Sequence, residues 1–217
     1  ATYYRAADIL MGFPKRFAES RKKVVEDLWN GVSDGVFMTS RDGLNWHRWL
    51  EAFIRPGQWQ KRWGQRNNMT AYGIVVTKAE TIGMPDELSI YASEAYCAEQ
   101  NGLRRYTLRI DGFVSVNAPY KGGEMITKPL TFDGKELVIN YATSAMGSVR
   151  VEITDKDGKA IPGFSLDECP EIYGDEIEKV VEWKSKPDLG ALAGKVVRLR
   201  FVLKDADLYS IKFGKYK

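Results

Sequence analysis

The sequence predicts a mostly β protein in which partial β-propeller blades are followed by an antiparallel β-sandwich. Three observations predict this class. Apolar residues alternate with polar ones along many short runs, and turn residues separate the runs about every ten residues in the C-terminal half. The third is a turn motif typical of blade rims, described below. We place the partial propeller at residues 1–111 and the sandwich at residues 112–217.

The first part reads as a series of strands with one exception. Strand-like runs are expected within residues 8–14, 34–49, 71–79, 87–97 and 103–111. The exception is the segment 17–32, which carries Val24, Val25 and Leu28 among charged residues. Its pattern fits either a short helix or a polar loop.

A turn motif lies inside the second of these runs. Ser40, Asp42, Gly43 and Trp46 form the pattern S-x-D-G-x-x-W. The aspartate can accept hydrogen bonds from nearby backbone amides, the glycine can adopt a positive φ, and the tryptophan can pack against the turn. We therefore interpret Asp42 as a structural residue of a blade-rim hairpin and not as a catalytic one.

The sandwich is predicted from clearer alternation. Val149, Val151 and Ile153 share one face of a strand, and residues 195–205 alternate in the same way. In the run 207–213, Tyr209, Ile211 and Phe213 are expected to point inward. Three further strands are expected within residues 122–132, 135–144 and 178–185.

Composition excludes several classes of function. The net charge is +3 and the basic residues are mixed with acidic ones, which argues against a nucleic-acid partner. No apolar run approaches the roughly 18 residues that a membrane span requires. A single histidine, His47, argues against histidine metal sites and a Ser-His-Asp triad. We expect no metal and no cofactor.

The cysteines, Cys97 and Cys169, could form one disulfide, although two buried free thiols are favoured.

The segment 56–73 is the most plausible ligand-binding stretch. It holds two tryptophans amid polar residues, and tryptophan faces stack on the C–H faces of sugar rings while arginine and asparagine donate hydrogen bonds to hydroxyls and carboxylates. The substrate-binding residues that we predict are Trp59, Trp63, Arg62, Arg66, Asn67 and Asn68. The alternative is that one tryptophan covers a blade edge and the arginines are surface charges.

Two carboxylates are candidates for catalysis. Glu94 ends an apolar strand, where a carboxylate could face a pocket and act as a general acid. Asp34 stands at the entry to another strand. The alternatives are a solvated strand end for Glu94 and turn capping for Asp34. The acidic run 167–178 lacks the spacing of a calcium-binding loop and is interpreted as a charged connection.

Four stretches resemble part of a known group of bacterial proteins. The stretches are SRDGLNWHRWLEAFIRPG, LRRYTLRIDGFVSV, GGEMITKPLTF and LRFVLKDADLYSIKF. They are similar to the C-terminal half of proteins related to glycoside hydrolase families 32 and 43. The resemblance implies a five-bladed β-propeller, with a C-terminal β-sandwich as in family 32. It also implies an oligo- or polysaccharide partner and an extracytoplasmic location, periplasmic or secreted.

The same resemblance limits what the chain can do alone. A five-bladed propeller needs roughly 300 residues, whereas only 111 are assigned here to blades. The resemblance implies three catalytic carboxylates from different blades, and the early-blade motifs W-M-N-D-P-N and R-D-P are absent from this sequence. The triplet Glu168-Cys169-Pro170 matches the E-C-P of family 32 but falls in the predicted sandwich, so we carry no acid role over to it.

We therefore expect the C-terminal portion of a glycoside-hydrolase-like protein that binds glycan. No complete hydrolase site is predicted within the chain, and further blades would come from a longer parent or a partner chain. The alternatives are a non-catalytic carbohydrate-binding module and a purely structural sandwich. They differ in whether the chain binds a saccharide at all.

Overall fold

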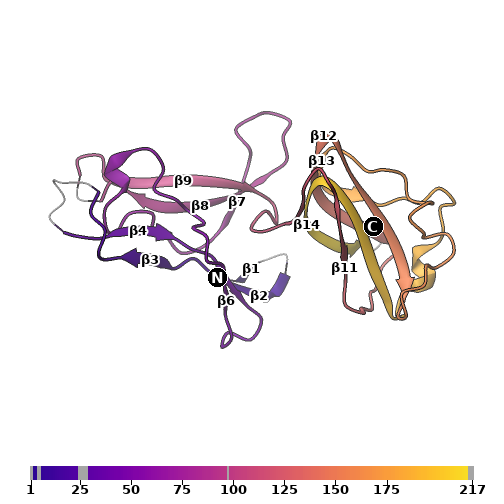
Figure 1. Cartoon of the computed structure of the whole chain (residues 1–217). Helices are drawn as coiled ribbons and strands as arrows, with labels where there is room; N and C mark the ends of the chain where they lie inside the picture. The colour runs from indigo at the N-terminus through magenta and orange to yellow at the C-terminus, as the bar shows by residue number, and fades with distance from the viewer. Residues whose placement is uncertain (1, 4–5, 24–28, 97, 215–217) are drawn as a thin grey trace. The chain divides into compact units, whose positions relative to one another are not determined.

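The fold is taken from a computed structural model, which describes residues 2–3, 6–23, 29–96 and 98–214. The chain divides into two compact units, unit 1 at residues 1–108 and unit 2 at residues 109–217. Both units are built from antiparallel strand pairs with little helix (Figure 1). The predicted fold class, mostly β with partial blades followed by an antiparallel sandwich, is confirmed.

Unit 1 contains three small sheets. The first has four strands in the order β1-β2-β5-β6, a size typical of one propeller blade. The second pairs β3 with β4, and the third has the order β7-β8-β9. The strands are β1 (Thr2–Tyr3), β2 (Ala6–Gly12), β3 (Lys15–Ala18), β4 (Val32–Gly35), β5 (Met38–Ser40), β6 (His47–Arg48), β7 (Val75–Thr77), β8 (Glu87–Glu94) and β9 (Gly102–Arg109).

The segment with two open interpretations is partly strand. Residues 15–18 and 32–35 at its ends form the β3–β4 pair. Val24, Val25 and Leu28, on which the helical alternative depended, lie outside the described residues.

Aromatic rings fill the interior near the first sheet. Phe37 lies 5.0 Å from Trp49, 5.4 Å from Phe13 and 5.4 Å from Phe53, measured between ring centroids. Rings at these separations add to the free energy gained from their burial. The cluster ties the strands of the first sheet to the segment that follows β6, which leads into the candidate site.

The turn after β5 has the structure that its motif predicts. Asp42 accepts hydrogen bonds from the backbone amides of Leu44 and Asn45, at 2.8 and 2.7 Å. Gly43 has a φ of +75°, and the Trp46 indole donates to the Gly43 carbonyl at 3.1 Å. Hydrogen bonds from Asn45, from its side chain and then its backbone, hold the pKa of Asp42 well below its ordinary range.

Replacing Asp42 by Ala should lower the thermal midpoint of unit 1 by a few degrees at pH 7. Because the pKa of Asp42 is lowered in the folded state, its contribution is present above the ordinary aspartate pKa of about 4 and is lost as the pH falls below it. The difference in thermal midpoint between the wild-type protein and the variant should therefore become smaller as the pH is lowered. Thermal melts between pH 3 and 7 measure it, and a difference independent of pH would contradict this account.

Unit 2 is organised around two long strands. Strands β12 (Glu136–Asp155) and β14 (Val197–Gly214) pair antiparallel along their length and lie side by side in Figure 1. The shorter strands are β10 (Val116–Ala118), β11 (Gly123–Ile126) and β13 (Asp175–Val180). The sheet order is β10-β14-β12-β13, with β11 also paired to β14.

The long pair changes register near its middle. Thr143 faces Ala206 and Ser148 faces Lys204, so four residues of β12 oppose Asp205 alone. Such an insertion bends a sheet. Residues on both sides of the change, Leu137 and Ile139 on one and Val151 on the other, are fully buried in one apolar cluster. The sandwich is thus one sheet that bends over a shared core.

One predicted inward residue is corrected. Tyr209 was expected to share the inner face with Ile211 and Phe213, but Leu208 takes the inward position instead. A register shift explains this, because Asn140 pairs with Ser210 and Tyr141 pairs with Leu208, which leaves Tyr209 as an extra residue. The Tyr209 ring lies under the Arg109 guanidinium, 4.4 Å from ring centroid to Cζ.

Cys169 is a buried free thiol in unit 2, as the favoured alternative expected. Its sulfur accepts a hydrogen bond from the Val151 amide at 3.3 Å, and burial raises the pKa of the thiol. Cys97 lies outside the described residues.

Candidate functional site

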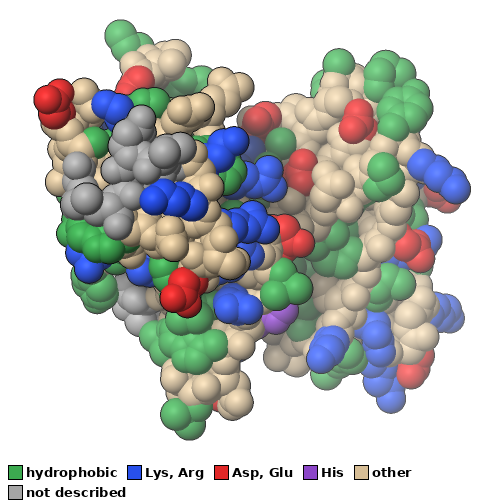
Figure 2. Space-filling view, turned by 60° about the vertical axis from the view of Figure 1, so that its left-hand side comes forward, with side chains coloured by type: hydrophobic (Ala, Val, Ile, Leu, Met, Phe, Trp, Pro, Cys, Tyr) green, Lys and Arg blue, Asp and Glu red, His purple; other side chains and the backbone are tan. Residues whose placement is uncertain are grey.

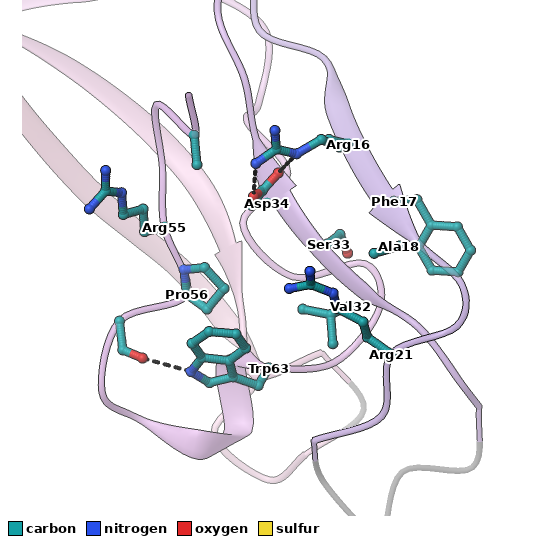
Figure 3. Close-up of a pocket in the computed structure, with 12 residues that line it drawn as sticks. Arg16, Phe17, Ala18, Arg21, Val32, Ser33, Asp34, Arg55, Pro56 and Trp63 are labelled. Atoms are coloured by element: carbon teal, nitrogen blue, oxygen red, sulfur yellow. Dashed lines mark hydrogen bonds and ion pairs between the residues drawn. The ribbon is translucent and has the colours of Figure 1, made fainter. Parts of the chain in front are cut away.

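A groove opens on unit 1 between two stretches that are distant in sequence. One wall consists of β3, β4 and the turn after β3, and the other consists of residues 52–63 (Figure 3). Its volume is about 740 Å³, within the range of small-ligand pockets. We name it the arginine groove. Its charged and aromatic lining residues are Arg16, Phe17, Arg21, Asp34, Arg55 and Trp63, and Pro56 also lines it.

Backbone hydrogen bonds hold the two walls together. Gly35, the last residue of β4, donates to the Ile54 carbonyl at 3.0 Å, and Ile54 donates back at 3.1 Å. The approach is close, because a Cβ on Gly35 would lie 3.0 Å from the Asn68 carbonyl oxygen and 3.2 Å from the Ile54 Cβ. The second wall is therefore fixed to the end of the strand that carries Asp34.

Asp34 is paired across the strands with Arg16. The two residues are directly opposite in the β3–β4 register, and both carboxylate oxygens accept from the guanidinium, at 2.9 and 2.5 Å. Arg16 also donates to the Leu50 carbonyl at 2.6 Å. The hydrogen bond to Asp34 raises the pKa of Arg16. A catalytic role for Asp34 stays a prediction, and it would require this bidentate pair to open.

Trp63 lies in the second wall with its ring orientation fixed. It follows the short 3-10 turn η1 (Gln60–Arg62), and its indole N–H donates to the Gly57 carbonyl at 2.7 Å (Figure 3). Gly57 has a φ of +72°, which favours glycine. Trp59 precedes the same turn and is 37% exposed, but it is not among the residues that line the groove.

Arg62 is a buried residue that is hydrogen-bonded to the second wall. It is only 6% exposed and donates to the Arg55 carbonyl at 3.2 Å, to the Asn68 side chain at 2.9 Å and to the Tyr106 hydroxyl. Its Nε also lies 3.4 Å from a Glu94 carboxylate oxygen. The guanidinium is thus committed to internal partners. A direct contact between Arg62 and a ligand stays a prediction, and it would require these internal bonds to open.

Asn67 and Asn68 are likewise buried and bonded internally. Asn68 is fully buried, and its amide group donates to the Ser33 carbonyl at 2.9 Å. Asn67 donates to the Lys61 carbonyl at 3.2 Å and accepts from the Tyr96 amide at 2.8 Å. The sequence suggested that these side chains face a ligand. In the structure they connect the segment 61–68 to β4 and to the end of β8.

Arg66 is the exposed member of this segment. Its guanidinium donates to the Tyr96 hydroxyl at 2.7 Å and lies 5.2 Å from the Tyr96 ring centroid and 5.7 Å from that of Trp29. Arg66, Asn68 and Ala95 all have left-handed backbone conformations, with φ of 63°, 59° and 52°. Strained backbone of this kind often holds a functional loop in one shape. Arg66 is not among the residues that line the arginine groove, and its contact with a ligand stays a prediction.

Glu94 lies between two arginines. Its Oε1 is 2.8 Å from Arg104 Nε and 3.4 Å from Arg62 Nε. Glu94 is not among the residues that line the arginine groove, whereas Asp34 is. The two predicted catalytic carboxylates are therefore not brought together in this lining. A catalytic role for Glu94 stays a prediction.

Among the residues of the lining that sequence reasoning missed are all three of its arginines, Arg16, Arg21 and Arg55. The first two come from a basic stretch between residues 15 and 23 that had no motif, and the third precedes Pro56. Only the β3–β4 pairing and the Gly35–Ile54 bonds bring them to one groove. The basic character of residues 15–23 beside an expected strand was the one available signal.

Comparison with known proteins yields one weak structural similarity. No protein-family model matches the chain, and no curated protein matches it. A crystal structure of a glycoside hydrolase family 43 arabinoxylan arabinofuranohydrolase from Bacillus subtilis, in complex with cellotetraose, aligns with 95% of the chain at 12% identity and a TM-score of 0.28. The chain covers 52% of that structure, about half its length. A similarity this low assigns no activity to the chain.

Neither a metal-binding cluster nor a membrane-spanning helix is found among the described residues. No group of three or more His, Cys, Asp and Glu side chains within them is arranged to hold a metal ion. None of their helices is long and apolar enough to cross a membrane.

Proposed function

We propose that the arginine groove binds a saccharide, so that the chain is a carbohydrate-binding portion of a carbohydrate-active protein. The observation that carries the proposal is Trp63, which lines the groove in a fixed orientation beside planar polar side chains. A sugar ring needs an apolar surface for its C–H face and planar donors for its hydroxyls. The groove offers both within one lining.

The internal hydrogen bond of Trp63 matters for this proposal. Because the indole N–H is already bonded to Gly57, the ring loses little further freedom when a ligand stacks on it. Pro56 adjoins it in the same wall (Figure 3). The buried bonds of Arg62 and Asn68 hold that wall in place before a ligand arrives.

Binding is better supported than hydrolysis by these residues. Glycoside hydrolysis needs two carboxyl groups about 5 to 10 Å apart. Among the described residues that line the groove, Asp34 is the one carboxylate, and Arg16 holds both of its oxygens. A hydrolase site in this groove would need a second carboxylate from outside the described lining. As part of the same proposal, we infer that the protein is periplasmic or secreted, because a polysaccharide ligand is expected outside the cytoplasm.

Replacing Trp63 by Ala should weaken saccharide binding by at least tenfold, because the stacking surface of the groove is lost. Isothermal titration of the whole chain with cellotetraose, xylotetraose and trigalacturonate measures the effect. Trp59→Ala is the matched control, since Trp59 belongs to the same segment but lies outside the groove lining. It should change affinity less than twofold.

Three results would contradict the proposal. They are equal losses in the two variants, unchanged affinity in Trp63→Ala, and no binding of any probe by the wild-type chain. The last result would favour the purely structural alternative. Thermal melts of both variants check that each remains folded.

A further inference from the structure

We propose that the saccharide of the arginine groove carries a carboxylate, as a uronic acid unit does. This inference rests on the proposed function and specifies its ligand. Three observations support it: the charged side chains of the lining, the ion pairs that these side chains form, and their positions on the two walls.

The lining holds an excess of positive charge. Its ionised side chains are three arginines, Arg16, Arg21 and Arg55, and a single carboxylate, Asp34. Arg16 and Asp34 neutralise each other through two hydrogen bonds. Within the part of the chain that the structure describes, neither Arg21 nor Arg55 forms a side-chain ion pair or hydrogen bond. The positive charges of Arg21 and Arg55 are therefore not neutralised by a partner among the described residues.

The two arginines come from opposite walls. Figure 3 shows the Arg21 side chain extending from its wall toward the space beside Trp63, whereas the Arg55 side chain, near Pro56 on the other wall, extends outward at the rim. A guanidinium binds a carboxylate through two parallel hydrogen bonds, the geometry that Arg16 and Asp34 already show here. A sugar stacked on Trp63 would place its ring substituents toward Arg21, and the exposed Arg55 side chain at the rim is long enough to turn toward a carboxylate on the same ligand.

The wider charge distribution agrees with an acidic ligand. The whole net charge of +3 lies in unit 1, because unit 2 contains equal numbers of basic and acidic residues. Lys and Arg side chains are prominent on the face of unit 1 in Figure 2. This excess is too small for the extended phosphate contacts of a nucleic acid. Its sign agrees with a ligand that carries one or a few carboxylates.

The test compares trigalacturonate with its methyl ester, which keeps the sugars and removes the charges. Titration calorimetry on the whole chain should show the acid binding about tenfold tighter than the ester. Arg21→Gln and Arg55→Gln should each weaken binding of the acid about fivefold and leave the ester unchanged. Arg48→Gln is the matched control, because Arg48 is an exposed arginine of unit 1 outside the groove lining. It should leave both affinities unchanged.

The outcomes separate this inference from the proposed function. Equal binding of acid and ester would overturn the inference and leave saccharide binding intact. An equal effect of Arg48→Gln would show attraction by net charge alone and would also overturn it. If neither the acid, the ester nor cellotetraose binds, the proposed function itself fails. A single-stranded oligonucleotide that binds in an Arg21-dependent way while the acid does not would replace the saccharide with a nucleic acid.

Discussion

Replacing Gly147 by Ala should destabilise unit 2 by about 3 kcal/mol, a typical cost for forcing an atom into a packed site. Gly147 lies where β12 carries four residues opposite Asp205. A Cβ there would lie 2.3 Å from the Asp205 carbonyl oxygen and 2.8 Å from that of Lys204. Both obstacles are backbone atoms of the paired strand, so a side-chain rotation cannot relieve the overlap. The bend that closes the sandwich would have to change.

Urea unfolding measures this effect through Trp183, the one tryptophan of unit 2, which is buried. The Trp183 indole N–H donates to the Val151 carbonyl at 3.1 Å. Its native NMR resonance should disappear at a lower urea concentration in the variant than in the wild type. Gly123→Ala is the control in the same sheet, since its nearest atom would lie at 3.8 Å. Equal midpoints for Gly147→Ala and wild type would show that the sheet does not bend as described.

Replacing Arg62 by Met should destabilise unit 1 by about 3 kcal/mol, because breaking a buried charged network leaves partners without compensation. The Glu94 carboxylate would lose its contact with Arg62 and keep its ion pair with Arg104, and the side-chain carbonyl of Asn68 would lose the donor Arg62. Methionine preserves most of the buried volume. The loss therefore reports the guanidinium and not a cavity.

Thermal melts and hydrogen exchange distinguish this loss from a surface effect. The Asn68 amide, which donates to the Ser93 carbonyl at 2.8 Å, should exchange faster in Arg62→Met. Arg48→Met removes an exposed arginine of the same unit and should leave both readouts unchanged. If Arg62→Met melts like wild type, Arg62 does not support the groove wall.

Much of the fold could be predicted because apolar and polar residues alternate along individual strands. The inward sets at Val149–Ile153 and Val197–Leu203 follow directly from period two. What alternation cannot show is a register change. The sequence separated residues 135–144 from 147–155, whereas one strand covers both, and Tyr209 lost its inward position to a one-residue shift.

The candidate site was predicted only in part. Trp63 was identified from chemistry that residue types reveal, and the structure places it in the groove lining. Burial of Arg62, Asn67 and Asn68 depends on contacts with β4, β8 and Tyr106, which are far away in sequence. The convergence of Arg21 and Arg55 on one groove likewise depends on strand pairing. Residue type indicated which side chains suit a saccharide, but the tertiary contacts decide which of them can reach one.

The most direct test of saccharide binding in the arginine groove is a titration followed through the tryptophan indole N–H resonances. The chain has six tryptophans, and a Trp63→Phe variant assigns the resonance of Trp63. With trigalacturonate or its methyl ester, the Trp63 resonance should move in a saturable way while that of buried Trp183 in unit 2 stays fixed. A Trp63 resonance that does not move with either probe at millimolar concentration, or moves no more than that of Trp183, would contradict the account.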